Sequence, residues 1–287
     1  METHFGSTIE KIRLQKGIPI NQFIQGIMDA STYHRFKTGK IDTTITKFTA
    51  LLNRLNVRFE EFLFINRNFK QDPSRSALII LQNSFNTKDL NQLKRLYEEI
   101  LEAEWVNPLA RNHIIELIQI YINVLENKPN NIENITLIQY LKSIETWTHY
   151  EIALFSNSLK ILPTELIDSF LQYMFRSFLI YQEMDNYQEE MSRIVIQAII
   201  SFLSRGEVYL ARKWYKQLRG QAISDFLLFE KFFIKLLGQY LEIAEGEKTP
   251  SQDLKKYEDM LNWLDCKGLA HNIENINQWI VTFYKMD

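Results

Sequence analysis

The sequence predicts an all-α protein built from two helical parts. Only 9 of its 287 residues are Gly and 6 are Pro, below the usual shares of about 7% and 5%, whereas 46% are hydrophobic and 13% aromatic. Apolar residues also recur at helical spacing, as in Phe48, Leu51, Leu52 and Leu55. Few chain breakers, much apolar mass and this period favour long helices over sheets, which need more turn residues.

Five short helices are expected within residues 1–65. Gly17 ends the first, and the second begins near Pro19, whose missing N–H is tolerated in a first turn. Asp29 is a suitable N-cap for the third helix, which Gly39 ends. The five segments are residues 5–16, 19–25, 30–38, 48–55 and 58–64.

The third segment offers a polar and basic helix face. Tyr33 and Phe36 fall on one side, as core residues would, and hydroxyl, imidazole and guanidinium groups occupy the others. Arg35 can donate two parallel hydrogen bonds to guanine, and hydroxyl groups can reach phosphates or base edges. The alternative is an ordinary solvated helix face. The candidate DNA-binding residues are Ala30, Ser31, Thr32, His34, Arg35 and Lys40.

Charge is distributed unevenly along the chain. Residues 1–70 hold 11 Lys and Arg against 6 Asp and Glu, a net charge of +5, whereas residues 71–287 hold 22 against 29, a net charge of −7. A basic N-terminal part followed by an acidic remainder is expected when only the N-terminal part binds double-stranded DNA.

Residues 17–40, GIPINQFIQGIMDASTYHRFKTGK, resemble the helix-turn-helix of the Rgg/MutR transcriptional regulators of Gram-positive bacteria. The resemblance implies that the third helix docks in the DNA major groove, with Arg35 as the strongest base reader. The matching residues are Gly17, Ile18, Phe23, Gly26, Ile27, Met28, Ser31, Tyr33, Arg35, Phe36 and Gly39.

Three positions depart from the family pattern. Ile20 follows Pro19 where the family has Thr-Gln, so an amide that grips phosphate is missing, and His34 replaces a serine. Lys37 replaces a Glu that pairs with a first-helix Arg, here Arg13, so we expect a like-charged pair. These changes favour weaker binding or a changed operator, and they leave open an interaction scaffold that has lost DNA binding.

A polar linker is expected at residues 66–74, and residues 75–287 are expected to form about ten helices of 11 to 22 residues. Short links between such helices imply stacked antiparallel hairpins. The run GEVYLARKWYKQL matches tetratricopeptide (TPR) packing positions at Gly206, Ala211, Tyr215 and Leu218. We therefore predict a TPR-like right-handed α-solenoid, whose concave face would be a peptide groove.

The run IETWTHYEIALFSNSL, residues 144–159, again resembles the Rgg/MutR regulators, in their carboxy-terminal domain. The resemblance implies a cytoplasmic homodimer that senses a short re-imported pheromone peptide in this groove and adjusts transcription. An extended peptide needs amides for its main chain, aromatic rings for its apolar side chains and charge for its ends. The candidate peptide-binding residues are Asn157, Tyr173, Arg176 and Tyr181. A regulator that answers to a partner protein or to a small apolar ligand remains an alternative.

Further features narrow the class of protein. No run of about 18 apolar residues and no secretory signal are visible, and the one cysteine, Cys266, is expected to be buried and reduced. These observations predict a cytoplasmic protein without a membrane partner. The terminal stripe of Trp279, Ile280, Phe283 and Tyr284 is broad enough to support dimerisation.

Motifs of catalysis are missing from the sequence. No phosphate loop, dinucleotide fingerprint, serine elbow, HExxH or EF-hand motif occurs, and the five histidines are scattered without zinc-ligand spacing. The sequence therefore predicts no metal, no cofactor and no enzymatic activity.

Overall fold

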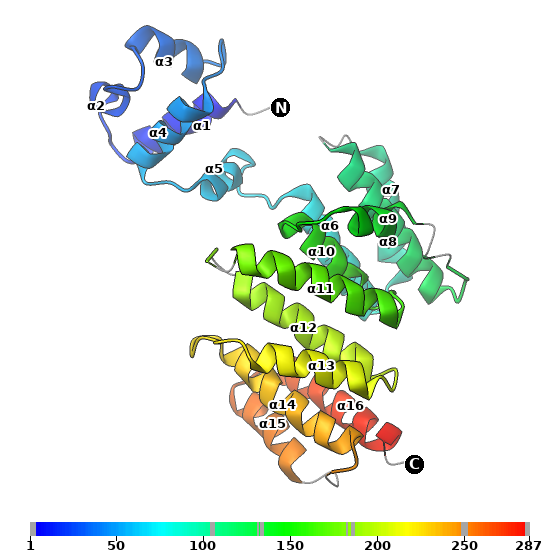
Figure 1. Ribbon diagram of the computed structural model, residues 1–287. Coiled ribbons are helices and arrows are strands. Elements are labelled where there is room, and N and C mark those ends of the chain that lie inside the picture. Colours follow the sequence, from blue (N-terminus) through cyan, green and yellow to red (C-terminus); the bar gives the residue numbers. More distant parts are fainter. Residues whose placement is uncertain are drawn as a thin grey trace. The chain divides into compact units, whose positions relative to one another are not determined.

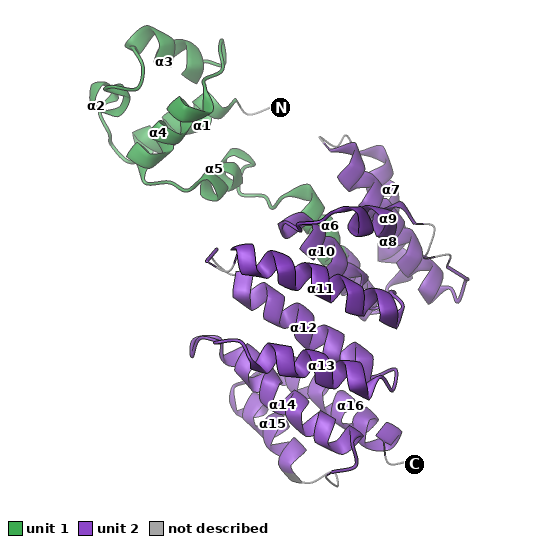
Figure 2. Ribbon diagram, viewed as in Figure 1, with its two compact units in different colours: residues 1–80 green, residues 81–287 purple. Residues whose placement is uncertain are grey.

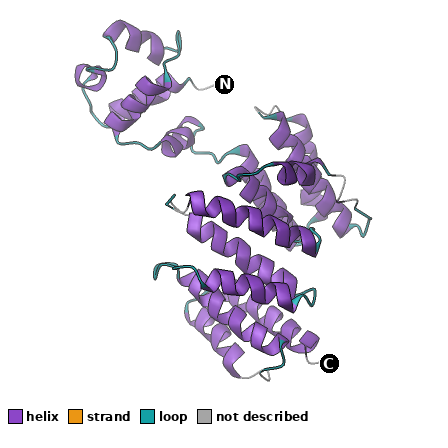
Figure 3. Ribbon diagram, in the orientation of Figure 1, coloured by secondary structure: helices purple, strands orange, loops and turns teal. Residues whose placement is uncertain are grey.

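The structure is a computed structural model that describes residues 4–284, except 104–106, 131, 133–134, 182, 185–186 and 248–251. All regular elements in the described residues are helices (Figure 3), which confirms the expected all-α class. The chain forms two compact units, residues 1–80 and residues 81–287 (Figure 2). In the first unit α1 packs against α3, α4 and α5, and α2 packs against α3 and α4. Its five helices (Figure 1) are α1 (Phe5–Gln15), α2 (Ile20–Ile24), α3 (Ala30–Lys37), α4 (Ile45–Leu55) and α5 (Phe59–Asn66).

The aromatic core of the first unit lies under α3. Phe23, Tyr33 and Phe62 are fully buried, and the rings of Phe23 and Tyr33 meet edge to face at 5.6 Å. The helices begin and end close to the expected residues, and α4 starts at Ile45, ahead of the apolar stripe that begins at Phe48. The earlier start has a local cause, because the Thr44 hydroxyl oxygen accepts a hydrogen bond from the Lys47 amide and caps the helix.

Close contact between α1 and α3 depends on Gly6. A Cβ atom built on Gly6 would lie 2.0 Å from the carbonyl oxygen of Phe36, far inside van der Waals contact. Any side chain at this position would push the two helices apart. The glycine therefore fixes how closely α3 sits on the helix behind it.

The second unit is a stack of helices. Neighbours in sequence pack on one another, as α7 does on α8, α12 on α13 and α15 on α16. Helix α6 (Pro73–Asn86) begins in the first unit and ends in the second. The other helices are α7 (Leu90–Glu102), α8 (Pro108–Leu125), α9 (Thr136–Ser143), α10 (His149–Ser158), α11 (Thr164–Tyr181), α12 (Tyr187–Leu203), α13 (Val208–Arg219), α14 (Leu228–Ala244), α15 (Gln252–Trp263) and α16 (Lys267–Tyr284).

Even-numbered helices make the more continuous layer of this stack. Helix α8 contacts α10, and α14 contacts both α12 and α16. Within the described residues, any contact between two odd-numbered helices of the second unit is smaller than each of these contacts between even-numbered helices. Contacts between next-nearest helices are what stacked helical hairpins produce.

The end of the chain needs one correction. Part of the stripe on α16 packs within its own unit, because Ile280 is buried and the Tyr284 hydroxyl donates to the Leu203 carbonyl oxygen at 2.7 Å. Phe283 is exposed, so the role of this stripe in dimerisation stays a prediction. Cys266 is exposed rather than buried, because it lies on the turn before α16, next to Asp265 with its φ of 58°. No helix in the described part of the chain is both long and apolar enough to cross a membrane.

Candidate DNA-binding surface and ligand-binding unit

Helix α3 begins at the predicted cap. Asp29 accepts hydrogen bonds from the Thr32 amide at 2.8 Å and from the Thr32 hydroxyl at 2.7 Å. These bonds favour the charged carboxylate and lower the pKa of Asp29. The Thr32 side chain is therefore part of the cap and half-buried, so only its oxygen lone pairs are left for DNA.

The other five candidate residues, Ala30, Ser31, His34, Arg35 and Lys40, are all exposed. Tyr33 and Phe36, on the opposite side of the helix, are buried, so this side anchors α3. The Arg35 guanidinium has no carboxylate partner among the described residues and can donate its N–H groups outward. This division into a buried and a free face is what a helix needs to enter a major groove.

Arg54 on α4 fixes the turn between α2 and α3. Its Nη1 lies 3.1, 2.8 and 2.7 Å from the carbonyl oxygens of Gln22, Phe23 and Gln25. These carbonyls end α2, where a cation is favoured by the helix dipole and by unpaired acceptors. Sequence reasoning missed this role because the partners lie about 30 positions away from Arg54.

Glu10 on α1 is the polar anchor behind α3. Its carboxylate accepts from Arg13 Nε at 2.7 Å, from the Tyr33 hydroxyl at 2.7 Å and from Lys37 Nζ at 2.9 Å. The Arg13 hydrogen bond contributes most to lowering the pKa of Glu10 to about 2.

This arrangement corrects the expectation of an unbalanced pair of cations. Arg13 and Lys37 do not face each other as uncompensated charges, because both bind the Glu10 carboxylate between them. The exchange of Glu for Lys37 thus keeps α3 tied to α1 through a different residue. Ile20, another of the three departures, packs against the apolar core.

The four candidate peptide-binding residues lie on two helices. Asn157 is on α10, half-buried, and its amide donates to the Ala153 carbonyl oxygen at 2.7 Å. The other three residues are on α11. The Tyr173 ring stacks on the Trp147 ring, with the ring centres 6.0 Å apart. The Arg176 guanidinium carbon lies 5.6 Å from the centre of the Tyr173 ring, in a cation–π contact. Tyr181 packs against Tyr187, with the ring centres 5.7 Å apart.

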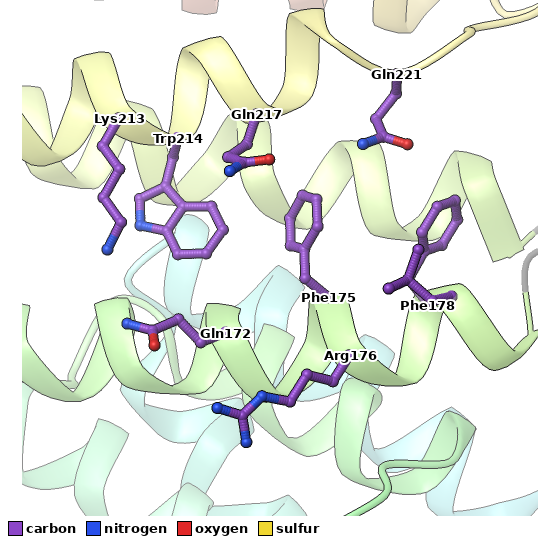
Figure 4. Close-up of a pocket in the computed structure, with 9 residues that line it drawn as sticks. Gln172, Phe175, Arg176, Phe178, Lys213, Trp214, Gln217 and Gln221 are labelled. Carbon is purple, nitrogen blue, oxygen red and sulfur yellow. The ribbon is translucent and has the colours of Figure 1, made fainter.

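Arg176 also lines a cavity of about 500 Å³ between α11 and α13 (Figure 4). Asn157, Tyr173 and Tyr181 do not line this cavity. Sequence reasoning missed the remaining residues of its wall, since they come from two segments about 40 positions apart. The lining residues are Gln172, Phe175, Arg176, Phe178, Leu179, Lys213, Trp214, Gln217 and Gln221. Among the described residues no three His, Cys, Asp or Glu side chains are grouped as a metal site would need.

The second unit matches a known domain. A family model of the C-terminal domain of the HTH-type transcriptional regulator Rgg covers residues 88–275, which is more than half of the chain. The chain belongs to the Rgg family. The matched range contains residues 144–159, so the resemblance inferred from that segment is confirmed.

Solved structures show that the Rgg-family fold extends over nearly the whole chain. A candidate transcriptional regulator from Listeria monocytogenes EGD-e superposes with a TM-score of 0.84 at 20% identity, over 99% of each chain. The SHP pheromone receptor Rgg2 of Streptococcus dysgalactiae superposes with a TM-score of 0.78 at 18% identity, over 96% of this chain and 100% of that one. PrgX in its complex with cCF10 superposes with a TM-score of 0.65 at 17% identity, over 95% of this chain and 98% of that one. At such identities the likeness concerns the fold.

Proposed function

We propose that this Rgg-family protein is a DNA-binding transcriptional regulator controlled by a short signalling peptide that its second unit binds. The exposed face of α3, backed by the buried Tyr33 and Phe36, is the observation that carries the DNA-binding part. The peptide part is supported by the family and by the relatives of the same fold. One of these is a pheromone receptor, and another was solved with its pheromone.

The DNA contacts are assigned by side-chain chemistry. Arg35 reads guanine, Ser31 and His34 reach neighbouring base edges or phosphates, and Lys40 neutralises a phosphate. Ala30 offers a small apolar surface for a thymine methyl group, and Thr32 acts as an acceptor from within the cap. In this assignment residues 1–65 are the DNA-binding domain, 66–74 the linker and 75–287 the peptide-binding domain.

The peptide contacts follow from the layers of the second unit. In a curved stack the layer whose helices come closest lies on the inside, so we infer that the even-numbered helices line the concave face. Asn157 on α10 then pairs with the peptide main chain through its carboxamide oxygen and its second N–H. Tyr173, Arg176 and Tyr181 lie on α11, in the odd-numbered layer, so we propose that they contact peptide side chains or a peptide end that reach past the even-numbered helices.

The experiment measures retention of the gene's own upstream DNA by the full-length protein. Binding is followed at rising salt for the wild type, for Arg35→Ala and for the exposed control Arg219→Ala on α13. We expect salt-sensitive retention that Arg35→Ala weakens and Arg219→Ala preserves. No salt-sensitive retention by the wild type would leave the interaction scaffold as the better account.

The peptide part is tested with synthetic peptides encoded by short reading frames beside the gene. We expect one of them to shift DNA affinity and to raise the melting temperature, and we expect Asn157→Ala to weaken both effects. A normal response of both Asn157→Ala and Arg176→Ala would contradict the assigned contacts. A response only to a partner protein would contradict peptide control.

We further propose that the protein acts in the cytoplasm as a homodimer, since paired recognition helices read two half-sites. Light scattering of the full chain at micromolar concentration tests the dimer, and a monomer would contradict it. The exposed part of the stripe on α16, which includes Phe283, is the candidate surface for the dimer. A small apolar ligand remains a second candidate effector, because the cavity between α11 and α13 has a suitable size.

A further inference from the structure

The cavity between α11 and α13 lies in the odd-numbered layer of the second unit, apart from the layer that holds Asn157. Its volume of about 500 Å³ falls in the range of small-molecule pockets, about 300–1,000 Å³. Figure 4 shows the rings of Phe175 and Trp214 between the two helices. The space is therefore large enough for a ring or a short alkyl chain with a polar head.

The apolar part of the wall is held in place. Phe175 and Trp214 meet with ring centres 5.2 Å apart, and Phe178 and Trp214 are only 4% and 3% exposed. The Trp214 Nε1 donates to Asp168 on α11 at 2.6 Å, so this ring is fixed by a hydrogen bond as well as by packing. A preformed aromatic wall binds an apolar group without the cost of ordering it.

The polar part of the wall has one unmatched positive charge. Lys213 Nζ lies 2.6 and 3.0 Å from the two Asp168 oxygens, so this charge is compensated. Arg176 is exposed and contacts the Tyr173 ring, and none of the described residues that line the cavity is Asp or Glu. The carboxamides of Gln217 and Gln221 make no hydrogen bond within the described part of the protein. The glutamine donors thus face a largely apolar space, and Figure 4 shows the Arg176 guanidinium directed away from the rings of Phe175 and Trp214, so this charge lies at the rim of the cavity.

We propose that this cavity is a ligand site for an apolar or aromatic group that bears a single carboxylate. The apolar group packs against Phe175, Phe178 and Trp214, and the carboxylate pairs with Arg176 with support from the glutamine amides. Two sources have this chemistry, namely a free aryl or alkyl carboxylic acid and the C-terminal residue of a peptide. The site stands on its own geometry and does not depend on peptide control.

The test uses 3-phenylpropionate as the probe and the neutral, similarly shaped 3-phenylpropanamide as its control. Calorimetry on the full-length protein compares the wild type with Arg176→Gln, with the cavity-filling Gln217→Phe and with Arg219→Gln. Both cavity positions are exposed, so the variants keep the fold, which circular dichroism checks. We expect the acid to bind the wild type and Arg219→Gln alike, and to bind Arg176→Gln about tenfold more weakly.

3-Phenylpropanamide should bind weakly to every variant, and Gln217→Phe should no longer bind 3-phenylpropionate. The proposal is overturned if the acid fails to bind the wild type at millimolar concentration. It is equally overturned if Arg176→Gln binds the acid like the wild type, or if the amide binds as well as the acid.

A competition arm identifies the source of the carboxylate. N-acetyl-Leu-Phe with a free C-terminus and its C-terminal amide are each added to the complex with 3-phenylpropionate. Displacement by the free acid form alone supports a peptide end, and displacement by neither supports a free small acid. Equal displacement by both forms would contradict recognition of a carboxylate. Because Asn157→Ala and DNA retention test the proposed function separately, either proposal can fail without the other.

Discussion

Lys37 Nζ lies 2.9 Å from Glu10 Oε1, and this ion pair ties the C-terminal turn of α3 to α1. The same carboxylate holds Arg13 on its own helix and the Tyr33 hydroxyl in the middle of α3. Three donors on one acceptor are stronger together than a surface pair, because the carboxylate is mostly shielded from water. Helix α3 is therefore anchored by polar contacts as well as by its aromatic side chains.

We expect Glu10→Gln to lower the free energy of unfolding by about 2 kcal/mol, since it leaves the buried Arg13 without its carboxylate. Urea denaturation of the full chain, followed by circular dichroism, measures the change in the first transition. The exposed Glu60 on α5 provides the matched control, and Glu60→Gln should change stability little. Equal effects of the two variants would contradict the anchoring role of Glu10.

Acid should reveal the same interaction. The pKa of Glu10 is about 2 in the folded protein and 4.5 as its ordinary value, so its stabilising effect is complete above about pH 5. As the pH falls from 4.5 towards 2, the unfolded state binds the proton first and this stability is lost. The difference in unfolding free energy between wild type and Glu10→Gln should therefore shrink over this window. A difference that is constant from pH 6 to pH 2 would contradict the low pKa.

Substitutions at Arg35 and Lys40 should separate base reading from phosphate contact. Arg35→Ala is expected to weaken binding to the operator about tenfold or more while leaving binding to unrelated DNA nearly unchanged. Lys40→Ala should weaken both and reduce the slope of log K against log salt by about 1. Fluorescence anisotropy at several salt concentrations measures both effects. Identical changes on both DNAs for Arg35→Ala would place this residue on the phosphates instead.

Two glycines give opposite predictions for the same substitution. Gly6→Ala forces α3 away from α1, because the added methyl group would overlap the Phe36 carbonyl, and should cost about 3 kcal/mol. Gly268 in the first turn of α16 has open space around the Cβ position, so Gly268→Ala should raise stability by about 0.5–1 kcal/mol. Thermal melts of both variants check the signs. A melting temperature unchanged in Gly6→Ala would show that α1 and α3 are not in close contact.

Local signals explain why the first five helices could be predicted from the sequence. Gly17, Pro19, Asp29 and Gly39 act within a few residues of the helix ends that they set, so reading the chain in short windows finds them. The burial of Tyr33 and the exposure of Arg35 follow from the helical period in the same way.

Contacts between distant segments could not be predicted in this way. Glu10 and Lys37 are 27 positions apart, and neither belongs to a shared periodic pattern. The cavity arises where α11 and α13 meet across the intervening α12, and Asp168 joins them over 45 positions. The terminal stripe on α16 is a similar case, because its apolar period does not tell that Ile280 packs within the protein whereas Phe283 stays exposed.

The residues that anchor α3 and the residues that face outward from it form almost separate sets. Tyr33, Phe36 and Lys37 hold the helix from behind, whereas the side chains of Ser31, His34 and Arg35 make no hydrogen bond or ion pair with the residues that the structure describes. In the proposed assignment, mutations of the outward set would alter which promoters are recognised at little cost in folding. Target preference would then be free to drift during evolution, and the same three positions would be the natural place to redesign it.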